Sequence, residues 1–281
     1  MTGAPPDPDG SHDVAEMLDL EEIDRDLYRA RSYGGPLRPF LFGGQVAAQA
    51  LRAAILTVEP DRAPHSLHGY FLRRGTSARP LLLQVHRDRD GGSFSARRVL
   101  AVQNGEVIFS AAASFHVRED SPEFQVASPE DAPDPDDPDL GYEESGGPGQ
   151  FFEMRSVVSP RRLRQMGFTR RLWTRARVAL PDDDGLHACA LTYATDFGSG
   201  FAELEIPGLA PAGPSLDHCI WFHHPIRLND WVFIDLWPLR ASGGRGTYMG
   251  TVHDRAGALG CVLTQEALLR MPPPGAPGPK G

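Results

Sequence analysis

The sequence predicts an α+β protein built from two copies of one unit, each combining an apolar helix with long antiparallel strands. Residues 89–115 and residues 241–268 both alternate apolar and polar side chains, pause, and alternate again. In both stretches a Gly-Gly pair precedes the turn glycine by the same distance, Gly92 to Gly105 and Gly244 to Gly257. Because related features recur at an offset of about 150 residues, we infer an internal duplication.

One helix is predicted in each half. In residues 42–58, Val46, Ala50, Leu51 and Ala54 fall on one face at helical spacing, behind a Gly-Gly start. The many small residues of this stretch suit a helix that a sheet wraps closely. Its counterpart in the second half is predicted over residues 184–197, with a less distinct start.

The strands follow from the alternation and from the turn residues. Asn104-Gly105 lies between two β-rich runs and is a strong hairpin signal. Ala256-Gly257 occupies the matching place in the second half. Upstream of these hairpins, "HSLHGYFLRRG" (65–75) corresponds in place and character to "PSLDHCIWFHH" (214–224), so we expect equivalent strands there.

An acidic, Pro- and Gly-rich stretch separates the halves. It holds few large apolar residues, so it is not expected to bury enough surface to offset chain entropy. We therefore predict an unstructured linker over residues 120–150, between an N-terminal unit at 11–119 and a C-terminal unit at 151–271. The Pro- and Gly-rich tails outside these units are also predicted to be unstructured.

Composition and charge argue against nucleic-acid binding and against a membrane-spanning protein. The net charge of −9 over 281 residues disfavours nucleic acid as a partner, although Arg73-Arg74 and Arg97-Arg98 could act locally on an anionic ligand. No apolar run approaches the roughly 20 residues of a membrane span, and the N-terminus carries no secretory signal, so we expect a cytoplasmic protein. The three cysteines are widely spaced in apolar surroundings and are predicted to be free thiols.

The stretch 214–224 concentrates polar side chains of the kinds that form metal sites or nucleophilic catalytic sites. Neighbours on a strand point to opposite faces, so His223 and His224 are not expected to share a metal ion. The same alternation argues against His218 acting as a base for a Ser215 nucleophile. Asp217 is left as a supporting acid or an interface residue, and Cys219 as a core residue. No G-x-S-x-G elbow is present, which argues against an α/β-hydrolase.

Five motifs, in order across both halves, resemble those of the bacterial acyl-CoA thioesterase II family, whose relatives include peroxisomal acyl-CoA thioesterases. They are "LFGGQVAAQAL", "HSLHGYFLRRG", "RDGGSFSARRVLAVQNGEVIFSAAASF", "SLDHCIWFHH" and "LTQEALLR". The resemblance covers nearly the whole chain apart from the tails and the linker. It implies a double hotdog fold, in which each unit has a long central helix wrapped by a curved antiparallel sheet and the two sheets pair side by side. It also implies an acyl-CoA substrate, no metal or other cofactor, and a homodimer or homotetramer.

The resemblance further implies three residues that position a hydrolytic water. The acid ends the "YATD" stretch and is Asp196, the hydroxyl precedes the Asp-His pair and is Ser215, and the amide in "TQEA" is Gln265. Asp196 can accept the proton of the water, while Ser215 and Gln265 can fix its orientation. Two departures are a short connection from Asp196 to Ser215, which could alter the acyl pocket, and Ala267 in place of a common glycine.

Catalysis is expected in the second half only. At the offset between the halves, Ala113 aligns with Gln265, and His68 stands near the position of Asp217. Gly43 and Gly44 have two open readings: their N–H groups could approach a carbonyl oxygen at the helix start, or they could let helix and sheet pack closely.

Two alternative functions stay open. A double-hotdog enoyl-CoA hydratase would want an Asp and a His facing one carbon, and the Asp-x-Asn-x-x-His segment typical of such enzymes is not seen. A non-catalytic acyl-CoA or acyl-carrier binding protein would not need the three polar residues that this chain retains.

Overall fold

The computed structural model describes residues 13–33, 39–125, 131–143, 147–158, 170–201 and 213–270. In the first half the elements are α1 (Val14–Met17), β1 (Glu21–Asp24), β2 (Leu27–Ala30), α2 (Gly43–Ile55), β3 (Arg62–Phe71), β4 (Leu81–Asp90), β5 (Phe94–Gln103) and β6 (Glu106–Val117). The tails predicted to be unstructured lie outside the described residues.

The second half repeats this pattern after a short edge strand and a 3-10 turn. Its elements are β7 (Gly141–Tyr142), η1 (Gly147–Phe151), β8 (Phe152–Val157), β9 (Arg170–Ala176), α3 (Asp184–Ala194), β10 (Asp217–Phe222), β11 (Val232–Ser242), β12 (Arg245–Asp254) and β13 (Leu259–Leu268). The helix–strand order of the two halves thus agrees with the predicted α+β class and with the inferred duplication.

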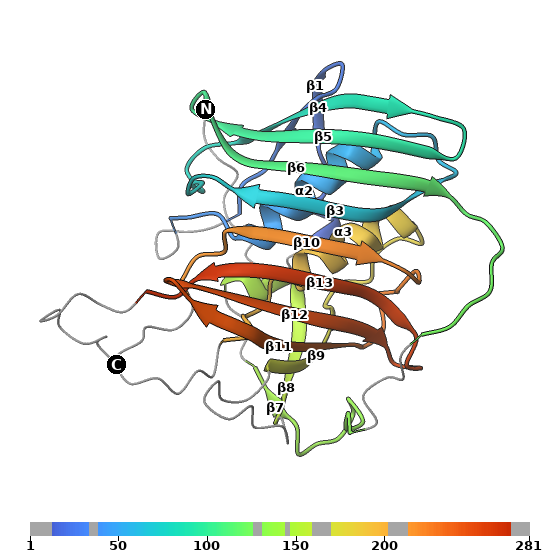
Figure 1. Ribbon diagram of the computed structural model, residues 1–281, viewed down its shortest axis with the longest axis vertical. Helices are drawn as coiled ribbons and strands as arrows, with labels where there is room; N and C mark the ends of the chain where they lie inside the picture. Colours follow the sequence, from blue (N-terminus) through green and yellow to red (C-terminus); the bar gives the residue numbers. More distant parts are fainter. Residues whose placement is uncertain are drawn as a thin grey trace, which may run out of the picture.

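All the described strands join one antiparallel sheet (Figure 1). The order is β1-β2-β4-β5-β6-β3-β10-β13-β12-β11-β9-β8-β7. Equivalent strands of the two halves follow each other in the same order from the centre of the sheet to its two edges: β6 lies next to β3 on one side, and β13 lies next to β10 on the other. The two halves are therefore related by an approximate two-fold axis at the β3–β10 seam.

The seam is formed by the two stretches whose likeness the sequence revealed. Strands β3 and β10 run antiparallel, with His68 opposite Cys219 and Leu67 opposite Ile220. Pairing of equivalent strands is what a two-fold axis through the His68–Cys219 pair produces. The seam joins the two halves into one continuous sheet, so a site at either end of it draws on both.

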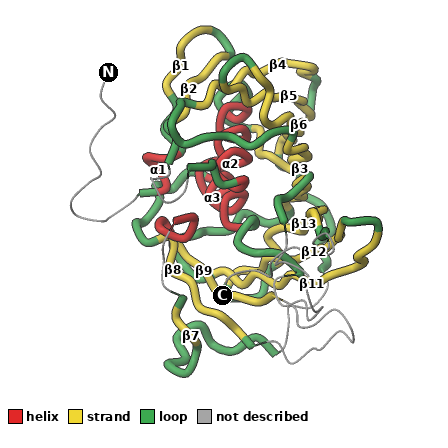
Figure 2. The backbone as a smooth tube through the Cα atoms, turned by 90° about the vertical axis from the view of Figure 1, so that its left-hand side faces the viewer, coloured by secondary structure: helices red, strands yellow, loops and turns green. Residues whose placement is uncertain are grey.

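Helices α2 and α3 lie against each other on one side of the sheet (Figure 2). Ten residues of α2 are buried, most of them alanine or another small residue, and α2 contacts β3, β4, β5 and β6. The predicted helices are confirmed with shorter bounds. They span 13 and 11 residues, so the expected long central helix is not seen; each is of ordinary length.

The predicted hairpin turns are present. Asn104 and Gly105 join β5 to β6 with φ values of 52° and 77°, the left-handed conformation that such a two-residue turn requires. In the second half Gly257 has φ 91° in the turn between β12 and β13. Glycine accepts this backbone at no steric cost, which explains the matching glycines in the sequence.

Residues 131–143, the longest described stretch of the predicted linker, pack against the second half. The Arg171 guanidinium donates to Asp131 at 2.8 Å and the Trp173 indole N–H donates to the Pro133 carbonyl at 2.9 Å. Leu140 also packs against the cluster that contains Trp231. The expectation of an unstructured segment is wrong for these residues, because the composition argument counted only the segment's own apolar side chains and not the aromatic surface that receives it.

Three further observations bear on the class of protein. No helix among the described residues is long and apolar enough to cross a membrane. The same residues hold no group of three or more His, Cys, Asp or Glu side chains placed to bind a metal ion. Cys189 and Cys261 are buried, Cys219 is partly buried, and all three are free thiols.

Candidate active site

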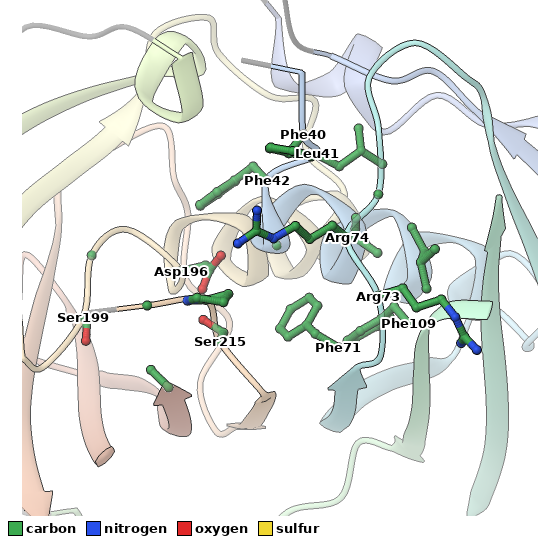
Figure 3. A pocket seen from close by; sticks show the side chains of 18 of the residues that line it. Phe40, Leu41, Phe42, Phe71, Arg73, Arg74, Phe109, Asp196, Ser199 and Ser215 are labelled. Carbon is green, nitrogen blue, oxygen red and sulfur yellow. The ribbon is translucent and has the colours of Figure 1, made fainter. Parts of the chain in front are cut away.

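A cavity of about 630 Å³ opens at one end of the seam, where α2 begins and α3 ends. Its apolar lining comes mainly from the first half and consists of Phe40, Leu41, Phe42, Val46, Phe71, Ile108, Phe109 and Tyr248. Its polar lining comes from both halves and includes Arg73, Arg74, Asp196, Ser199 and Ser215. Figure 3 shows the side chains of Asp196 and Ser215 pointing toward one another, with Phe71 and Phe109 across from them.

Asp196 follows the C-terminal end of α3. The helix ends at Ala194, and Thr195 is its C-cap residue, so Asp196 leaves the helix and meets the cavity. One carboxylate oxygen, Oδ2, accepts a hydrogen bond from the Gly44 N–H at 2.8 Å, and Oδ1 accepts one from Gln265 Nε2 at 2.9 Å. Each oxygen keeps a further lone pair that can face a water.

Gly44 allows close packing, between α2 and α3 and not between helix and sheet, and its N–H donates to the Asp196 carboxylate and not to a carbonyl oxygen. A Cβ atom on Gly44 would lie 2.5 Å from the Tyr193 carbonyl oxygen, so only glycine allows the two helices to approach. The N-cap residue Phe42 offers no side-chain hydrogen bond to the helix. The carboxylate of Asp196 supplies that missing acceptor, and the positive end of α2 favours its charge.

Gln265 and Ser215 complete the group predicted from the sequence. Gln265 is 1% exposed on the inner face of β13, as the strand alternation indicated. Its Nε2 donates to Ser215 Oγ as well as to Asp196. Ser215 precedes β10 and is held by an isolated bridge to Ala267. The structure thus brings Asp196, Ser215 and Gln265 into one hydrogen-bonded group at the cavity.

His218 belongs to the same group through Gln265 and Thr195, contacts that were not predicted from the sequence. The side chain is 1% exposed. Its Nδ1 lies 2.5 Å from Gln265 Oε1 and its Nε2 lies 2.9 Å from Thr195 Oγ1. The pairing of β10 with β13 could have indicated this contact, because Cys219 faces Thr264 across the two strands and His218 therefore adjoins Gln265.

The electrostatics of the site favour a proton acceptor. Desolvation raises the pKa of Asp196 above its ordinary value, while the nearby His218 and the hydrogen bonds from Gln265 and Gly44 work in the opposite direction. Such a carboxyl group binds a proton more strongly than an exposed aspartate does. Burial also holds the pKa of Tyr248 well above its usual range, so this phenol is neutral at physiological pH.

The other polar residues singled out in the sequence lie apart from this group. Asp217 accepts a hydrogen bond from the Glu266 N–H at 2.6 Å, and desolvation raises its pKa. His223 and His224 line a different cavity. Arg97 is buried and donates to Thr57 Oγ1 at 2.8 Å, a structural role, whereas Arg73 and Arg74 are exposed at the mouth of the first cavity.

The second cavity, of about 1080 Å³, lies at the opposite end of the seam. It is lined by the start of β3 and by residues at the ends of β6 and β10, where the two-fold axis places the counterpart of the first cavity. The helix that begins at the second cavity is α3, and its first residue is Asp184, whereas α2 begins at the first cavity with Gly43. Leu67 and Ala113, paired across β3 and β6, stand where His218 and Gln265 stand in the other half. The duplicated cavity has therefore not kept the polar group.

Comparisons with known proteins match both halves. The family models of an acyl-CoA thioesterase N-terminal domain and C-terminal domain match residues 32–116 and 127–269. Acyl-coenzyme A thioesterase 8 of Mus musculus is 35% identical over 286 residues, covering 92% of this chain and 89% of that protein. The crystal structure of acyl-CoA thioesterase II TesB2 from Mycobacterium marinum is 39% identical, with a TM-score of 0.78, and covers 92% of this chain and 98% of that one.

A more distant structure shows the fold alone. It is a conserved protein of unknown function with a hot dog fold from Alicyclobacillus acidocaldarius, 21% identical with a TM-score of 0.75. The similarity covers 94% of this chain and all, 100%, of that one. The large antiparallel sheet described above is thus the sheet of a hot dog fold.

Proposed function

This chain belongs to the acyl-CoA thioesterase family and is an acyl-CoA thioester hydrolase, and from that premise we propose that Asp196, Ser215 and Gln265 hold the water that attacks the thioester. The products are a free fatty acid and CoA. The observation that carries the proposal is the hydrogen-bonded group itself, in which Gln265 Nε2 bridges Asp196 and Ser215, the two members that line the cavity.

Asp196 is the proposed proton acceptor. Its oxygens are held by the Gly44 N–H and by the Gln265 amide, so the carboxylate is fixed before substrate arrives. The water oxygen attacks the carbonyl carbon while its proton passes to Asp196. The C–S bond then breaks, and the CoA sulfur leaves with the proton. The raised pKa of Asp196 suits this task, because it strengthens the carboxylate as a base.

Ser215 is proposed to orient the water, and the start of α2 to stabilise the developing oxyanion. Since Ser215 Oγ accepts from Gln265, its own hydrogen is free to point into the cavity. Gly43 lies at the first turn of α2, where N–H groups have no partner within the helix. A Cβ atom on Gly43 would lie 2.9 Å from Asp196 Oδ2 and 3.1 Å from Phe71 Cζ, so glycine keeps this approach open.

The lining of the cavity supports the substrate class. Aromatic and aliphatic side chains such as Phe42, Phe71 and Phe109 offer a surface for an acyl chain. The exposed guanidinium of Arg74 stands at the mouth, stacked over Phe40 at 5.2 Å. We infer that Arg73 and Arg74 contact the phosphates of CoA, since guanidinium groups bind phosphate strongly.

We further infer a double hotdog organisation, with tandem units over residues 11–119 and 151–271 and the boundary within residues 120–150. In this arrangement α2 and α3 are the two central helices. We also propose a homodimer or homotetramer formed through the outer face of the seam, where Tyr70, Leu72 and Trp221 are 64%, 52% and 38% exposed. Light scattering of the wild type and of Trp221→Glu tests this proposal, which predicts a loss of the larger species in the variant.

The test of function is thiol release from a panel of acyl-CoA substrates. Wild type should turn over at least one chain length. Asp196→Ala should lower kcat by at least about 100-fold, the scale of general base catalysis. The matched control is Asp217→Asn, a nearby acid outside the group, which should stay within about threefold of wild type. An Asp196→Ala enzyme as active as wild type would remove the proposed role.

The same panel separates the two alternative functions. Loss of crotonyl-CoA absorbance without release of thiol would indicate hydration of the double bond. Saturable binding of acyl-CoA with no turnover at any chain length would indicate a binding protein. Either outcome contradicts the proposed hydrolysis, whereas thiol release that depends on Asp196 supports it.

A further inference from the structure

A buried imidazole lies behind the proposed catalytic group and does not reach the cavity. His218 is 1% exposed on the inner face of β10, and the residues that line the first cavity include Ser215 but not His218. Both ring nitrogens have an oxygen partner, Gln265 Oε1 at 2.5 Å and Thr195 Oγ1 at 2.9 Å. Any effect of His218 on the reaction must therefore pass through these two partners.

The hydrogen bonds determine which way the Gln265 amide faces. Its Oε1 atom can only accept, so the Nδ1 atom of His218 must donate to it. Both hydrogens of Nε2 are then available for Asp196 Oδ1 and Ser215 Oγ. With the amide turned over, Oε1 would face the Asp196 carboxylate, two acceptors in contact without a hydrogen between them.

The contacts close into a ring. Thr195 Oγ1 lies 2.8 Å from the Thr192 carbonyl oxygen at the end of α3 and 2.9 Å from His218 Nε2. With Nδ1 as the donor to Gln265, a neutral imidazole accepts the single hydroxyl hydrogen at Nε2. His218 holds Gln265, Gln265 holds Asp196, and Asp196 is the residue that follows Thr195 in the chain. A closed ring of buried hydrogen bonds restrains each member more than a single contact does.

We propose that His218 is a positioning residue for thioester hydrolysis: its Nδ1–H fixes the Gln265 amide so that Nε2 holds Asp196 and Ser215 in the geometry that the water requires. This inference rests on the proposed roles of Asp196, Ser215 and Gln265. His218 does not touch the substrate. Its influence appears in the turnover rate and not in substrate affinity, because the bound acyl-CoA never meets it.

A double-mutant cycle tests the inference against a purely structural role. His218→Leu removes the donor and should lower kcat about 10- to 100-fold with KM unchanged. In a Gln265→Ala background the same change should cost less than about twofold, because the partner through which His218 acts is already absent. Equal losses in the two backgrounds, or no loss in either, overturn the proposal.

His218→Asn keeps the experiment decisive should the leucine variant fold poorly. An asparagine amide can place a donor close to the position of Nδ1, so kcat should stay within about threefold of wild type. Loss of activity in folded His218→Asn as great as in the Gln265→Ala variant would overturn the proposal. The Gln265→Ala single variant separately tests the proposed function, which fails if that variant retains wild-type turnover.

His253 provides the matched control. It is also a buried histidine, 2% exposed on β12, and neither of its ring nitrogens has a hydrogen-bond partner among the described residues. His253→Leu should leave kcat unchanged in both backgrounds. Thermal unfolding of every variant, measured beside kcat, separates a loss of folded protein from a loss of turnover; a fall in kcat for His253→Leu equal to that of His218→Leu would overturn the specific role of His218.

Discussion

The Gly44 N–H donates to the Asp196 carboxylate at 2.8 Å across 152 residues of sequence. This single contact joins the first turn of the first half's helix to the residue that follows the second half's helix. The proposed catalytic residues all lie in the second half, yet the acid among them is held by the first. The duplicated unit therefore does more than complete the wall of the cavity.

Gly44→Ala is expected to impair both folding and catalysis. The added Cβ atom would meet the Tyr193 carbonyl oxygen at 2.5 Å and Asp196 Cβ at 3.0 Å, so α2 and α3 must move apart. Overpacking of this kind costs about 1–3 kcal/mol of unfolding free energy, and the shift moves the N–H away from Asp196. Urea unfolding and kcat measure the two effects.

The matched control for this substitution is Gly92→Ala. A Cβ atom on Gly92 would meet nothing within 4 Å, and the residue lies in a turn remote from the cavity. Unfolding midpoint and kcat should both stay close to wild type. A Gly44→Ala enzyme that behaves like Gly92→Ala would show that the close approach of the helices is not needed.

The pH dependence of kcat should show an acidic limb set by Asp196. The carboxylate form accepts the proton, so activity falls as the pH is lowered and the group becomes protonated. Because burial raises the pKa of Asp196, the fall begins at a higher pH than for an exposed aspartate, whose pKa is about 3.9. A kcat profile that stays flat down to the stability limit of the protein would contradict this assignment.

The same shift predicts a pH-dependent gain in stability for Asp196→Asn. A group whose pKa is raised on folding stabilises the folded state below its unfolded pKa, and this stabilisation is lost as the pH rises through the folded value. Wild type therefore carries a penalty at neutral pH that an amide avoids. The Tm difference between Asp196→Asn and wild type should be largest at neutral pH and shrink toward about pH 4; a constant difference would contradict it.

The family resemblance pointed to Asp196, Ser215 and Gln265. Strand alternation was used only to argue against His218 as a base for Ser215 and did not predict the contact of His218 with Gln265. Strand alternation placed Ser215 and His218 on opposite faces, which assumes that both lie on one regular strand. In the structure β10 begins at Asp217, and Ser215 precedes it in an isolated bridge to Ala267. Gln265 then spans the gap between them. The period of two holds only inside the strand, and the start of a strand is the least certain feature of a sequence-based prediction.

The linker shows a second limit of the same kind. A segment's own composition predicts whether it can fold alone, and residues 131–143 cannot. It does not predict a receptor surface elsewhere in the chain, such as the Trp173, Trp231 and Phe233 cluster that Leu140 packs against. Features with a local signal, such as the Asn104-Gly105 turn and the apolar helix α2, were predictable because their cause lies within a few residues.

Substitution at the mouth of the first cavity should separate substrate affinity from turnover. Arg74→Ala removes an exposed guanidinium stacked on Phe40 and should raise KM several-fold with kcat unchanged, because the contact is the same in the ground and transition states. The effect should weaken as salt is added. Arg98→Ala, an exposed arginine paired with Asp88 at 3.4 Å, is the control; an Arg74→Ala enzyme with the KM of Arg98→Ala would remove Arg74 from the phosphate site.

Filling the first cavity with a larger side chain should change the preferred acyl chain length, whereas filling the second cavity should not. Val46 on α2 lines the first cavity and Ala188 on α3 lines the second. Val46→Phe places a ring where the acyl chain is proposed to lie, so the preferred substrates should become shorter. Ala188→Phe should leave kcat and chain-length preference unchanged, because Asp184 and Ala113 stand there in place of the helix glycine and Gln265. The measurement is kcat/KM across a series of acyl-CoA chain lengths. If the chain-length profile is unchanged for Val46→Phe but shifted for Ala188→Phe, the acyl chain lies in the second cavity and the proposal is wrong.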